Sequence, residues 1–435
     1  MKALVIGSGG REHAIVWALK RTSNVQLDLY CAPGNAGISQ LAECVSISTG
    51  DHKSLIEFAQ ANGIDMTIVG PEGPLAEGIV DEFTHHGLKI IGPSRAASRL
   101  ESSKSFAKDF MRRHQIPTAE YCVANSADEA LAALRTGRFG APDSPVVVKA
   151  DGLAAGKGVI VAPSRRDAER AIADLAAGTL VAAEATKQLL IEEALEGREV
   201  SVLLFTDGRD YALMPAARDH KRIGENDTGP NTGGMGAITD HSVLDKNTLD
   251  RIVREVVEPT LRGASEEGFP FRGILFVGLM LTAAGPKVLE YNVRFGDPET
   301  QAILMRLKSD LFSIFQATVD GNLRSVKVEW SDQSSACVVL ASAGYPGTYE
   351  TGGSINGLDQ VLTNNNLQIF HAGTANAAGG SLVTSGGRVL GVTSAESTLE
   401  QALTNCYRAI DRIDWPGMQF RRDIGRFGEG LKASN

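Results

Sequence analysis

The segment VVVKADGLAAGKGVIVA occupies residues 146–162. An apolar strand delivers Lys149, and a second strand begins after a loop that contains Lys157 and the glycines Gly152, Gly156 and Gly158. Glycine lets backbone amides approach a phosphate closely, and lysine neutralises phosphate charge. A Walker A loop places Ser or Thr after its lysine and leads into a helix, which this loop does not. In protein kinases the glycine loop precedes the strand that carries the lysine, so that order does not fit either.

This pattern predicts a β-hairpin that closes over a polyphosphate. The alternative is an ordinary hairpin with an exposed lysine, which the pair of lysines beside three glycines makes the less favoured interpretation. The acidic segment LLIEEALEGREVSV follows at residues 189–202. A purine base could be read by backbone groups near Glu193–Leu195, and Glu199 could hold ribose hydroxyls. Taken alone, Glu192, Glu193 and Glu199 are equally typical of solvated strand ends.

A second strand-like segment, KVLEYNVRFGDPETQ, spans residues 287–301. Side chains alternate between the two faces of a strand, so Leu289, Tyr291 and Val293 are expected in the core. The other face then presents Glu290, Asn292 and Arg294. Carboxylate and amide oxygens suit Mg²⁺, which usually takes one or two protein ligands, and Arg294 suits a phosphate or a carboxylate. An exposed edge strand with salt bridges is the alternative.

The loop ARDHKRIGENDTGPNTGGMGA (217–237) is long, polar and rich in glycine. Loops longer than roughly 12–15 residues tend to be functional or disordered, and we expect a polar loop between Pro215 and Gly236. His220 suggests a general base, but a single histidine in a polar loop is more often a hydrogen-bonding partner.

Residues 1–100 alternate strand-like and helix-like pieces, which predicts a parallel sheet covered on both faces. Its ligand site is expected at the carboxyl ends of the strands. The first of these ends, GSGGREH, resembles a dinucleotide fingerprint, but Glu12 stands at the third glycine position and no acid closes the second strand. We therefore expect Gly9, Gly10 and Arg11 at the helix start to hold the phosphate of a phosphorylated sugar and not NAD.

The remainder of the chain divides by the same kind of pattern. A helix over 98–117 leads to a small α+β unit at 118–190 and to strands at 191–325 without intervening helices, which suggests an antiparallel sheet. The fold class is therefore α/β and α+β multidomain. The predicted domains are a parallel α/β domain at 1–103, a two-part domain at 104–328 (120–190 and 191–328), and a small C-terminal α+β domain at 329–435.

The composition is that of a soluble globular protein, with 43% hydrophobic and 22% charged residues. A net charge of −9 argues against a nucleic-acid or membrane-surface partner. Five cysteines without a C-x-x-C pair indicate a reducing compartment, and no run approaches the roughly 18 apolar residues of a membrane span. We expect a cytoplasmic protein and a monomer.

In combination, these motifs resemble the ATP-grasp superfamily, whose members bind ATP between two α+β subdomains and activate a carboxylate as an acyl phosphate. Longer motifs, including KADGLAAGKGV, GPNTGGMGA and EYNVRFGDPETQ, are similar to the family of phosphoribosylamine–glycine ligases, also called glycinamide ribonucleotide synthetases. The resemblance covers residues 1–425. It departs at Arg218, where Gln is expected, and at Arg198, where Glu is commoner.

The resemblance implies that ATP, glycine and 5-phosphoribosylamine give glycinamide ribonucleotide, ADP and phosphate through glycyl phosphate in de novo purine biosynthesis. It implies Mg²⁺ or Mn²⁺ on Glu290 and Asn292. The implied ATP contacts are Lys104, Lys149, Gly152, Gly156, Lys157, Gly158, Glu192, Glu193, Leu195 and Glu199. The implied substrate contacts are Gly9, Gly10, Arg11, Pro71, Glu72, Asp219, Asn231, Thr232, Gly233, Gly234, Arg294 and Asp297, and Arg294, Lys149 and Asp219 would serve catalysis.

Three other functions compete with this interpretation. A different ATP-grasp ligase, such as a carboxylase or a peptide ligase, would share the nucleotide site. A nucleotide sensor without chemistry would not need Glu290, Asn292 and Arg294 together. An NAD-dependent oxidoreductase is disfavoured by Glu12 and by the second strand.

Replacing Lys157 tests the predicted hairpin. Lys157→Ala removes one positive charge from the loop, so we expect weaker binding of ATP, measured by titration calorimetry. An affinity equal to that of the unaltered chain would contradict the closure of this hairpin over the nucleotide.

Overall fold

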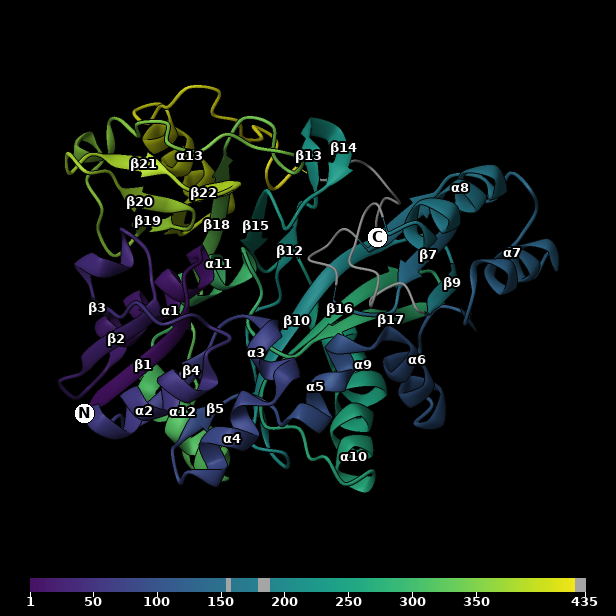
Figure 1. Ribbon diagram of the computed structural model, residues 1–435, viewed down its shortest axis with the longest axis horizontal. Coiled ribbons are helices and arrows are strands. Elements are labelled where there is room, and N and C mark those ends of the chain that lie inside the picture. Colours follow the sequence, from purple (N-terminus) through teal and green to yellow (C-terminus); the bar gives the residue numbers. More distant parts are fainter. Residues whose placement is uncertain (154–157, 179–187, 427–435) are drawn as a thin grey trace.

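The computed structural model describes residues 1–153, 158–178 and 188–426 (Figure 1). The N-terminal part forms a five-stranded sheet in the order β3-β2-β1-β4-β5, and every pairing in it is parallel. Its strands and helices are β1 (Lys2–Gly7), α1 (Gly10–Thr22), β2 (Asp28–Pro33), β3 (Glu43–Cys44), α2 (His52–Asn62), β4 (Met66–Val69), α3 (Glu72–Glu77), α4 (Ile79–His85) and β5 (Ile90–Ile91). The predicted parallel α/β architecture is confirmed.

Two predicted helices are each broken in the structure. The segment 71–87 divides into α3 and α4 at Gly78, whose φ of 100° lies in the left-handed region that favours glycine. The predicted helix over 98–117 is α5 (Arg95–Ser102) followed by α6 (Lys104–Arg113). The break falls at Ser103, where the backbone is extended and the side chain accepts a hydrogen bond from the Phe106 N–H, as an N-cap does.

Two four-stranded antiparallel sheets follow. The first has the order β6-β9-β7-β8 and contains β6 (Tyr121–Ala124), β7 (Val146–Ala150), β8 (Val159–Ala162) and β9 (Leu189–Glu193), with α7 (Ala127–Arg135) and α8 (Arg165–Ala176) beside it. The second has the order β11-β10-β16-β17 and contains β10 (Arg198–Thr206), β11 (Tyr211–Leu213), β16 (Gly273–Thr282) and β17 (Gly285–Asn292). The predicted antiparallel sheet in the region 191–325 is confirmed. The strand predicted at 188–195, however, is β9, which pairs with β6 and β7 of the first sheet and not with β10 of the second.

Helices also interrupt the region that we expected to hold strands alone. α9 (Lys246–Ile252), a π-helical turn (Val253–Val257) and α10 (Glu258–Glu266) form one helical stretch before β16. Figure 1 shows this stretch beside the sheet of β10, β16 and β17. The helices α11 (Glu299–Met305) and α12 (Leu311–Asp320) follow β17, and α12 contacts both α1 and β5 of the N-terminal sheet.

The fourth large sheet joins the loop at 217–237 to the C-terminal part of the chain. Its order is β12-β15-β18-β22-β19, from β12 (Arg218–Asp219), β15 (Gly236–Thr239), β18 (Ser334–Ala341), β19 (Leu367–His371) and β22 (Arg388–Glu396), with β20 (Thr374–Asn376), β21 (Leu382–Thr384) and α13 (Leu399–Ile410) nearby. Besides β12 and the start of β15, the predicted polar loop contains the hairpin of β13 (Arg222–Gly224) and β14 (Thr228–Asn231). About half of this loop is therefore strand.

An aromatic cluster packs β10, the end of β17 and α12 together. Phe205, Phe295 and Phe315 are fully buried, and their ring centroids lie 6.0–6.2 Å apart in edge-to-face arrangements. Aromatic pairs in this geometry add to the free energy gained from burial alone.

Phe295→Ala is expected to lower the free energy of unfolding by about 3–5 kcal/mol, because it removes a buried ring and leaves a cavity. Chemical denaturation followed by tryptophan fluorescence measures this change. Leu362→Ala is the control, since Leu362 is 84% exposed and exposed substitutions usually change stability by less than about 0.5 kcal/mol. Equal effects of the two substitutions would contradict the role of the cluster.

Candidate active site

The strand β17 places Glu290 and Asn292 on its partly exposed face, while Tyr291 is buried between them. Tyr291 shares a 2.7 Å hydrogen bond with Thr260. The register shifts at Leu289, so that Gly278 faces Glu290 and Leu279 faces Val288. This irregularity corrects the simple alternation that we expected: Val288 is buried in place of Leu289, as a β-bulge allows.

Arg294 lies just beyond the end of β17, held by two carboxylates. Its guanidinium is 3.3 Å from Glu72 and 3.0 Å from Glu101, and it donates to the Asn292 Oδ1 at 3.1 Å. Burial alone would lower the pKa of Arg294, but the charges of Glu101 and Glu72 outweigh it and raise the pKa above its usual value. The predicted residues Glu72, Asn292 and Arg294 are therefore brought together, with Glu101 as a partner that the sequence did not reveal.

Lys149 lies near the end of β7, and its ammonium contacts a residue of each antiparallel sheet. Its Nζ lies 2.9 Å from the Glu192 carboxylate on β9 and donates at 3.2 Å to the Leu289 carbonyl on β17. Glu192 also pairs with Lys108, and only 1% of Glu192 is exposed. Burial encloses the Glu192 carboxylate between two lysines, and its predicted contact with ATP stays a prediction.

Lys104 lies at the first position of α6, against the segment that follows β7. Its Nζ donates to the Gly152 carbonyl at 3.0 Å, and the Asp151 carboxylate accepts from the Ser105 N–H at 2.6 Å. Burial lowers the pKa of Lys104, and Glu290 opposes this shift. Gly158 is buried, and its carbonyl accepts from the Ala150 N–H. The predicted contacts Gly156 and Lys157 lie outside the described residues.

The connection from Glu193 to Arg198 passes from one antiparallel sheet to the other. Glu193 ends β9, and its carboxylate accepts from Lys287 Nζ at 3.2 Å and from the Glu120 N–H at 3.3 Å. Leu195 lies in the link and is half-buried. Both residues thus lie where the two sheets meet.

Glu199 on β10 pairs with Lys221, at 2.7 Å between Oε2 and Nζ. Burial alone would lower the pKa of Lys221, but Glu199, Asp219 and Glu290 raise it well above its usual value. Burial raises the pKa of Asp219, while Lys221 opposes that shift. Lys221, which adjoins the predicted Asp219, is thus paired with an acid of β10.

The segment 231–234 is fixed from the C-terminal side. Arg388 donates to the Gly233 carbonyl at 2.6 Å and lies 3.0 Å from the Asp297 carboxylate. Thr232 Oγ1 donates to the Lys221 carbonyl at 2.8 Å and accepts from the Gly234 N–H at 2.9 Å. The predicted residues Asn231, Thr232, Gly233, Gly234 and Asp297 therefore form one neighbourhood, and Arg388 is its unpredicted member.

The N-terminal residues Gly9 and Arg11 contact other groups of the protein, and their predicted contact with a substrate stays a prediction. The Gly9 N–H donates to the Glu12 carboxylate at 2.6 Å, and the Arg11 guanidinium lies 2.6 Å from Glu12 and donates to the Phe295 carbonyl. The Gly9 N–H and two nitrogens of the Arg11 guanidinium thus have partners within the protein. Gly10 starts α1 in close packing, because a Cβ there would lie 2.8 Å from Gln301, and Pro71 precedes α3 as its N-cap.

The charge of Asp219 on β12 affects the pKa of Glu299 on α11. Glu299 is buried, and burial together with the charge of Asp219 raises the pKa of Glu299 to about 7.

His220 is also buried; its Nε2 accepts from the Gly425 N–H at 2.9 Å, and burial lowers its pKa to about 4. His220 is thus a hydrogen-bonding partner, the second of the two interpretations of this residue.

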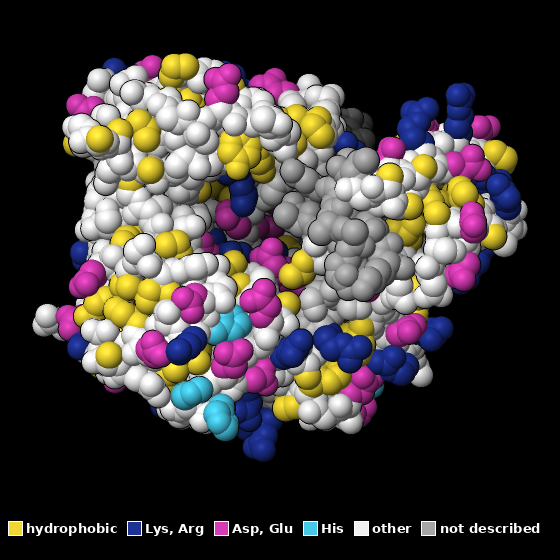
Figure 2. Space-filling model, in the orientation of Figure 1, with side chains coloured by type: hydrophobic (Ala, Val, Ile, Leu, Met, Phe, Trp, Pro, Cys, Tyr) yellow, Lys and Arg dark blue, Asp and Glu magenta, His cyan; other side chains and the backbone are white. Residues whose placement is uncertain are grey.

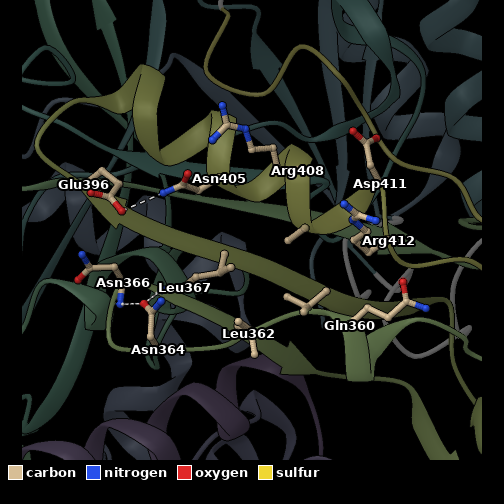
Figure 3. A pocket seen from close by; sticks show the side chains of 12 residues that line it. Gln360, Leu362, Asn364, Asn366, Leu367, Glu396, Asn405, Arg408, Asp411 and Arg412 are labelled. Atoms are coloured by element: carbon tan, nitrogen blue, oxygen red, sulfur yellow. Dashed lines mark hydrogen bonds between the residues drawn. The ribbon is translucent and has the colours of Figure 1, made fainter.

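Figure 2 shows charged side chains of both signs in the hollow between the parts of the molecule. A separate hollow of about 660 Å³ lies on the C-terminal part, between α13 and the segment 360–367 (Figure 3). It contains none of the predicted site residues. No group of three or more His, Cys, Asp or Glu among the described residues could hold a metal by itself, and none of the described helices is long and apolar enough to cross a membrane.

Comparisons with known proteins agree with one another. Residues 1–101 match the phosphoribosylglycinamide synthetase N domain, 102–300 its ATP-grasp (A) domain and 335–427 its C domain. A phosphoribosylamine–glycine ligase of Brucella melitensis is 47% identical over 98% of this chain and 97% of its own. One of Rhodopirellula baltica is 48% identical over 97% of this chain and 96% of its own.

Solved structures show the same relationship. The crystal structure of phosphoribosylamine–glycine ligase from Thermotoga maritima has a TM-score of 0.80 and 34% identity, covering 97% of this chain and all of that one. A biotin carboxylase of Campylobacter jejuni has a TM-score of 0.70 at 18% identity, covering 96% of this chain and 92% of that one, and shares the fold alone. Because the family models match most of its length, the chain belongs to the phosphoribosylglycinamide synthetase family.

Proposed function

We propose that this protein is an ATP-dependent ligase that joins glycine to 5-phosphoribosylamine and releases glycinamide ribonucleotide, ADP and phosphate. The relatives named phosphoribosylamine–glycine ligase support this activity, since they are 47–48% identical over nearly the whole chain. The reaction belongs to purine biosynthesis, and the scattered cysteines favour the cytoplasm as its location.

One observation carries the proposal: Lys149 from one antiparallel sheet and Lys104 from α6 lie close to the strand of the other sheet that carries Glu290 and Asn292. Lys149 bridges the two sheets through Glu192 and Leu289, and the pKa values of Lys104 and Glu290 influence each other. Phosphoryl transfer needs positioning and neutralisation of charge more than it needs a base. This arrangement supplies both between the two sheets.

We propose that the nucleotide lies between the two antiparallel sheets. Lys104, Lys149 and Lys157 would hold its phosphates, with the glycines Gly152, Gly156 and Gly158 beside them. The link that includes Glu193 and Leu195 would face the adenine. Glu199 would bind the ribose hydroxyls with a carboxylate that it shares with Lys221. The positions of Glu193 at the end of β9 and of Glu199 near the start of β10 support this assignment.

The oxygens of Glu290 and Asn292 fit a divalent cation such as Mg²⁺ or Mn²⁺. Burial tends to raise the pKa of Glu290, but Lys221, Lys149 and Lys104 outweigh it and lower the pKa, so its carboxylate is an anion at neutral pH. Mg²⁺ commonly takes only one or two carboxylate or amide ligands from protein and the remainder from phosphates and water. When bound, such an ion would neutralise charge on the phosphate oxygens.

In the proposed reaction, the glycine carboxylate attacks the γ-phosphate of ATP, and ADP departs with the electrons of the broken bond. The amine of phosphoribosylamine then attacks the acyl carbon of glycyl phosphate, the bond from that carbon to the phosphate oxygen breaks, and the phosphate leaves with the proton that the amine loses. Arg294 provides a fixed positive charge at the end of β17, because Glu72 and Glu101 hold its guanidinium. Asp219, Asp297 and the segment 231–234 would line the pocket for the two substrates, and the amine attacks without a base from the protein.

A different ATP-grasp ligase is the second candidate, because a biotin carboxylase shares this fold. ADP release measured in a coupled assay separates the two. Turnover that requires both glycine and phosphoribosylamine supports our proposal, whereas equal turnover with bicarbonate would overturn it.

Glu290→Ala is expected to lower the turnover of ATP by at least about 100-fold, because it removes a charge that faces the reacting phosphates. Steady-state kinetics over a range of Mg²⁺ concentrations measures this loss. Glu400→Ala is the control, since Glu400 is exposed in the first turn of α13. Near-normal turnover of the Glu290 variant would remove the metal assignment.

A further inference from the structure

Lys108 is a buried lysine that the reaction proposed above does not use. It lies on α6, and 2% of its side chain is exposed. Its ammonium is 2.8 Å from the Glu192 carboxylate and 2.8 Å from the Thr118 hydroxyl, and it lies 5.8 Å from the centre of the Tyr121 ring. Protein atoms therefore surround the charge, and Lys108 does not reach a ligand between the sheets.

The carboxylate of Glu192 holds two lysines at one oxygen. Its Oε2 lies 2.8 Å from the Lys108 Nζ and 2.9 Å from the Lys149 Nζ. Glu192 is 1% exposed, so its charge is balanced by these two ammonium groups and not by bulk water. The three side chains carry a net charge of one positive unit, from two ammonium groups and one carboxylate.

This charge balance matters when Lys149 moves. A buried carboxylate that loses its only cation is strongly destabilised, because its charge is left without water or a partner. If Glu192 had Lys149 alone, a phosphate would have to compete with that carboxylate for the ammonium. With Lys108 in place, Glu192 keeps a partner while Lys149 turns toward a phosphate.

We propose that Lys108 is a positioning residue that holds the Glu192 carboxylate and thereby leaves the Lys149 ammonium available to the nucleotide phosphates. The inference rests on the proposed function for the identity of the nucleotide as ATP. It assigns Glu192 the role of a shared anchor between the two lysines, which agrees with the burial of its carboxylate.

The ionisation of Lys108 fits this role. Burial lowers its pKa to about 8, Glu192 opposes the shift, and Lys149 and Lys287 add to it. The groups that face it are Glu192 on β9, Lys149 on β7, Lys287 on β17 and the Tyr121 ring on β6. As pH rises through about 8, Lys108 loses its proton and the net charge of the cluster falls from one to zero.

The test compares two variants of the full chain. Lys108→Met changes the net charge of the cluster from one to zero, whereas the double variant Lys108→Met with Glu192→Gln returns it to one. We expect the single variant to bind ADP and a non-hydrolysable ATP analogue at least about tenfold more weakly, which corresponds to about 1.4 kcal/mol. The double variant is expected to recover most of this affinity, and the KM for glycine is expected to stay within about twofold in both.

Lys327→Met is the matched control, because Lys327 is 83% exposed and pairs only with Glu329 on the surface. Titration calorimetry between pH 7 and pH 9 gives a second measurement on the unaltered chain. Nucleotide affinity should fall over this range as Lys108 loses its proton, and the double variant should lack that fall. The dependence of nucleotide affinity on pH, compared between the unaltered chain and the double variant, still tests the inference if Lys108→Met fails to fold.

Two results would overturn the inference. One is a folded Lys108→Met protein that binds nucleotide as tightly as the unaltered chain, and the other is a double variant that recovers none of the loss. A purely structural role would lower the unfolding midpoint without changing affinity or its dependence on pH. Binding of nucleotide without any turnover of glycine and phosphoribosylamine would instead count against the proposed function and leave the role of Lys108 intact.

Discussion

The ion cluster around Arg294 connects the N-terminal sheet to the strand that carries the site. Glu72 comes from α3, Glu101 from α5, and Arg294 from the end of β17. Glu101 also accepts from the Val293 N–H at 2.7 Å, so one carboxylate fixes both the backbone and the side chain at this point. A partly buried cluster of this kind is costly to break, because loss of one member leaves a charge without a partner. The position of Glu290 and Asn292 therefore depends on helices whose carboxylates lie 192 and 222 residues before the groups that they hold.

The same principle operates between the two antiparallel sheets. Lys149 belongs to one sheet and donates to a carbonyl of the other, at a place where the irregularity of β17 presents the Leu289 carbonyl. Lys221 connects the loop to β10 through Glu199. Among the described residues, Lys104, Lys149, Lys221 and Arg294 are thus all paired with acids or carbonyls of the protein. These partners limit the cost of holding several like charges near each other.

Local patterns allowed much of this molecule to be predicted. The strands at 2–7, 146–150 and 285–292 follow from their apolar residues, and the glycine-rich turns mark the ends of the N-terminal strands. Glu290, Asn292 and Lys149 could be recognised because short motifs place them on strands. By contrast, Lys108 looks like an ordinary surface lysine of a helix, and only the fold shows that it is buried.

The misplaced elements have related physical causes. The strand at 189–193 has a pattern that suits either antiparallel sheet, and long-range pairing with β6 and β7 decides between them. The loop at 217–237 is polar because β12 and the hairpin of β13 and β14 are short and half-exposed, so periodicity gave no signal for strands. The contact of Arg11 with the Phe295 carbonyl, 284 residues away in the sequence, could likewise not be read from local patterns.

The segment at 421–425 has a consequence for how the protein is made. Arg421 pairs with Asp227 and Asp423, Asp423 accepts from the Asn226 N–H, and the Gly425 N–H donates to His220. These contacts hold a turn in which Asn226 and Asp227 both have positive φ. Synthesis of 425 residues takes on the order of 20–85 s at roughly 5–20 residues per second. These contacts to the loop at 217–237 therefore cannot form before residues 421–425 have been synthesised.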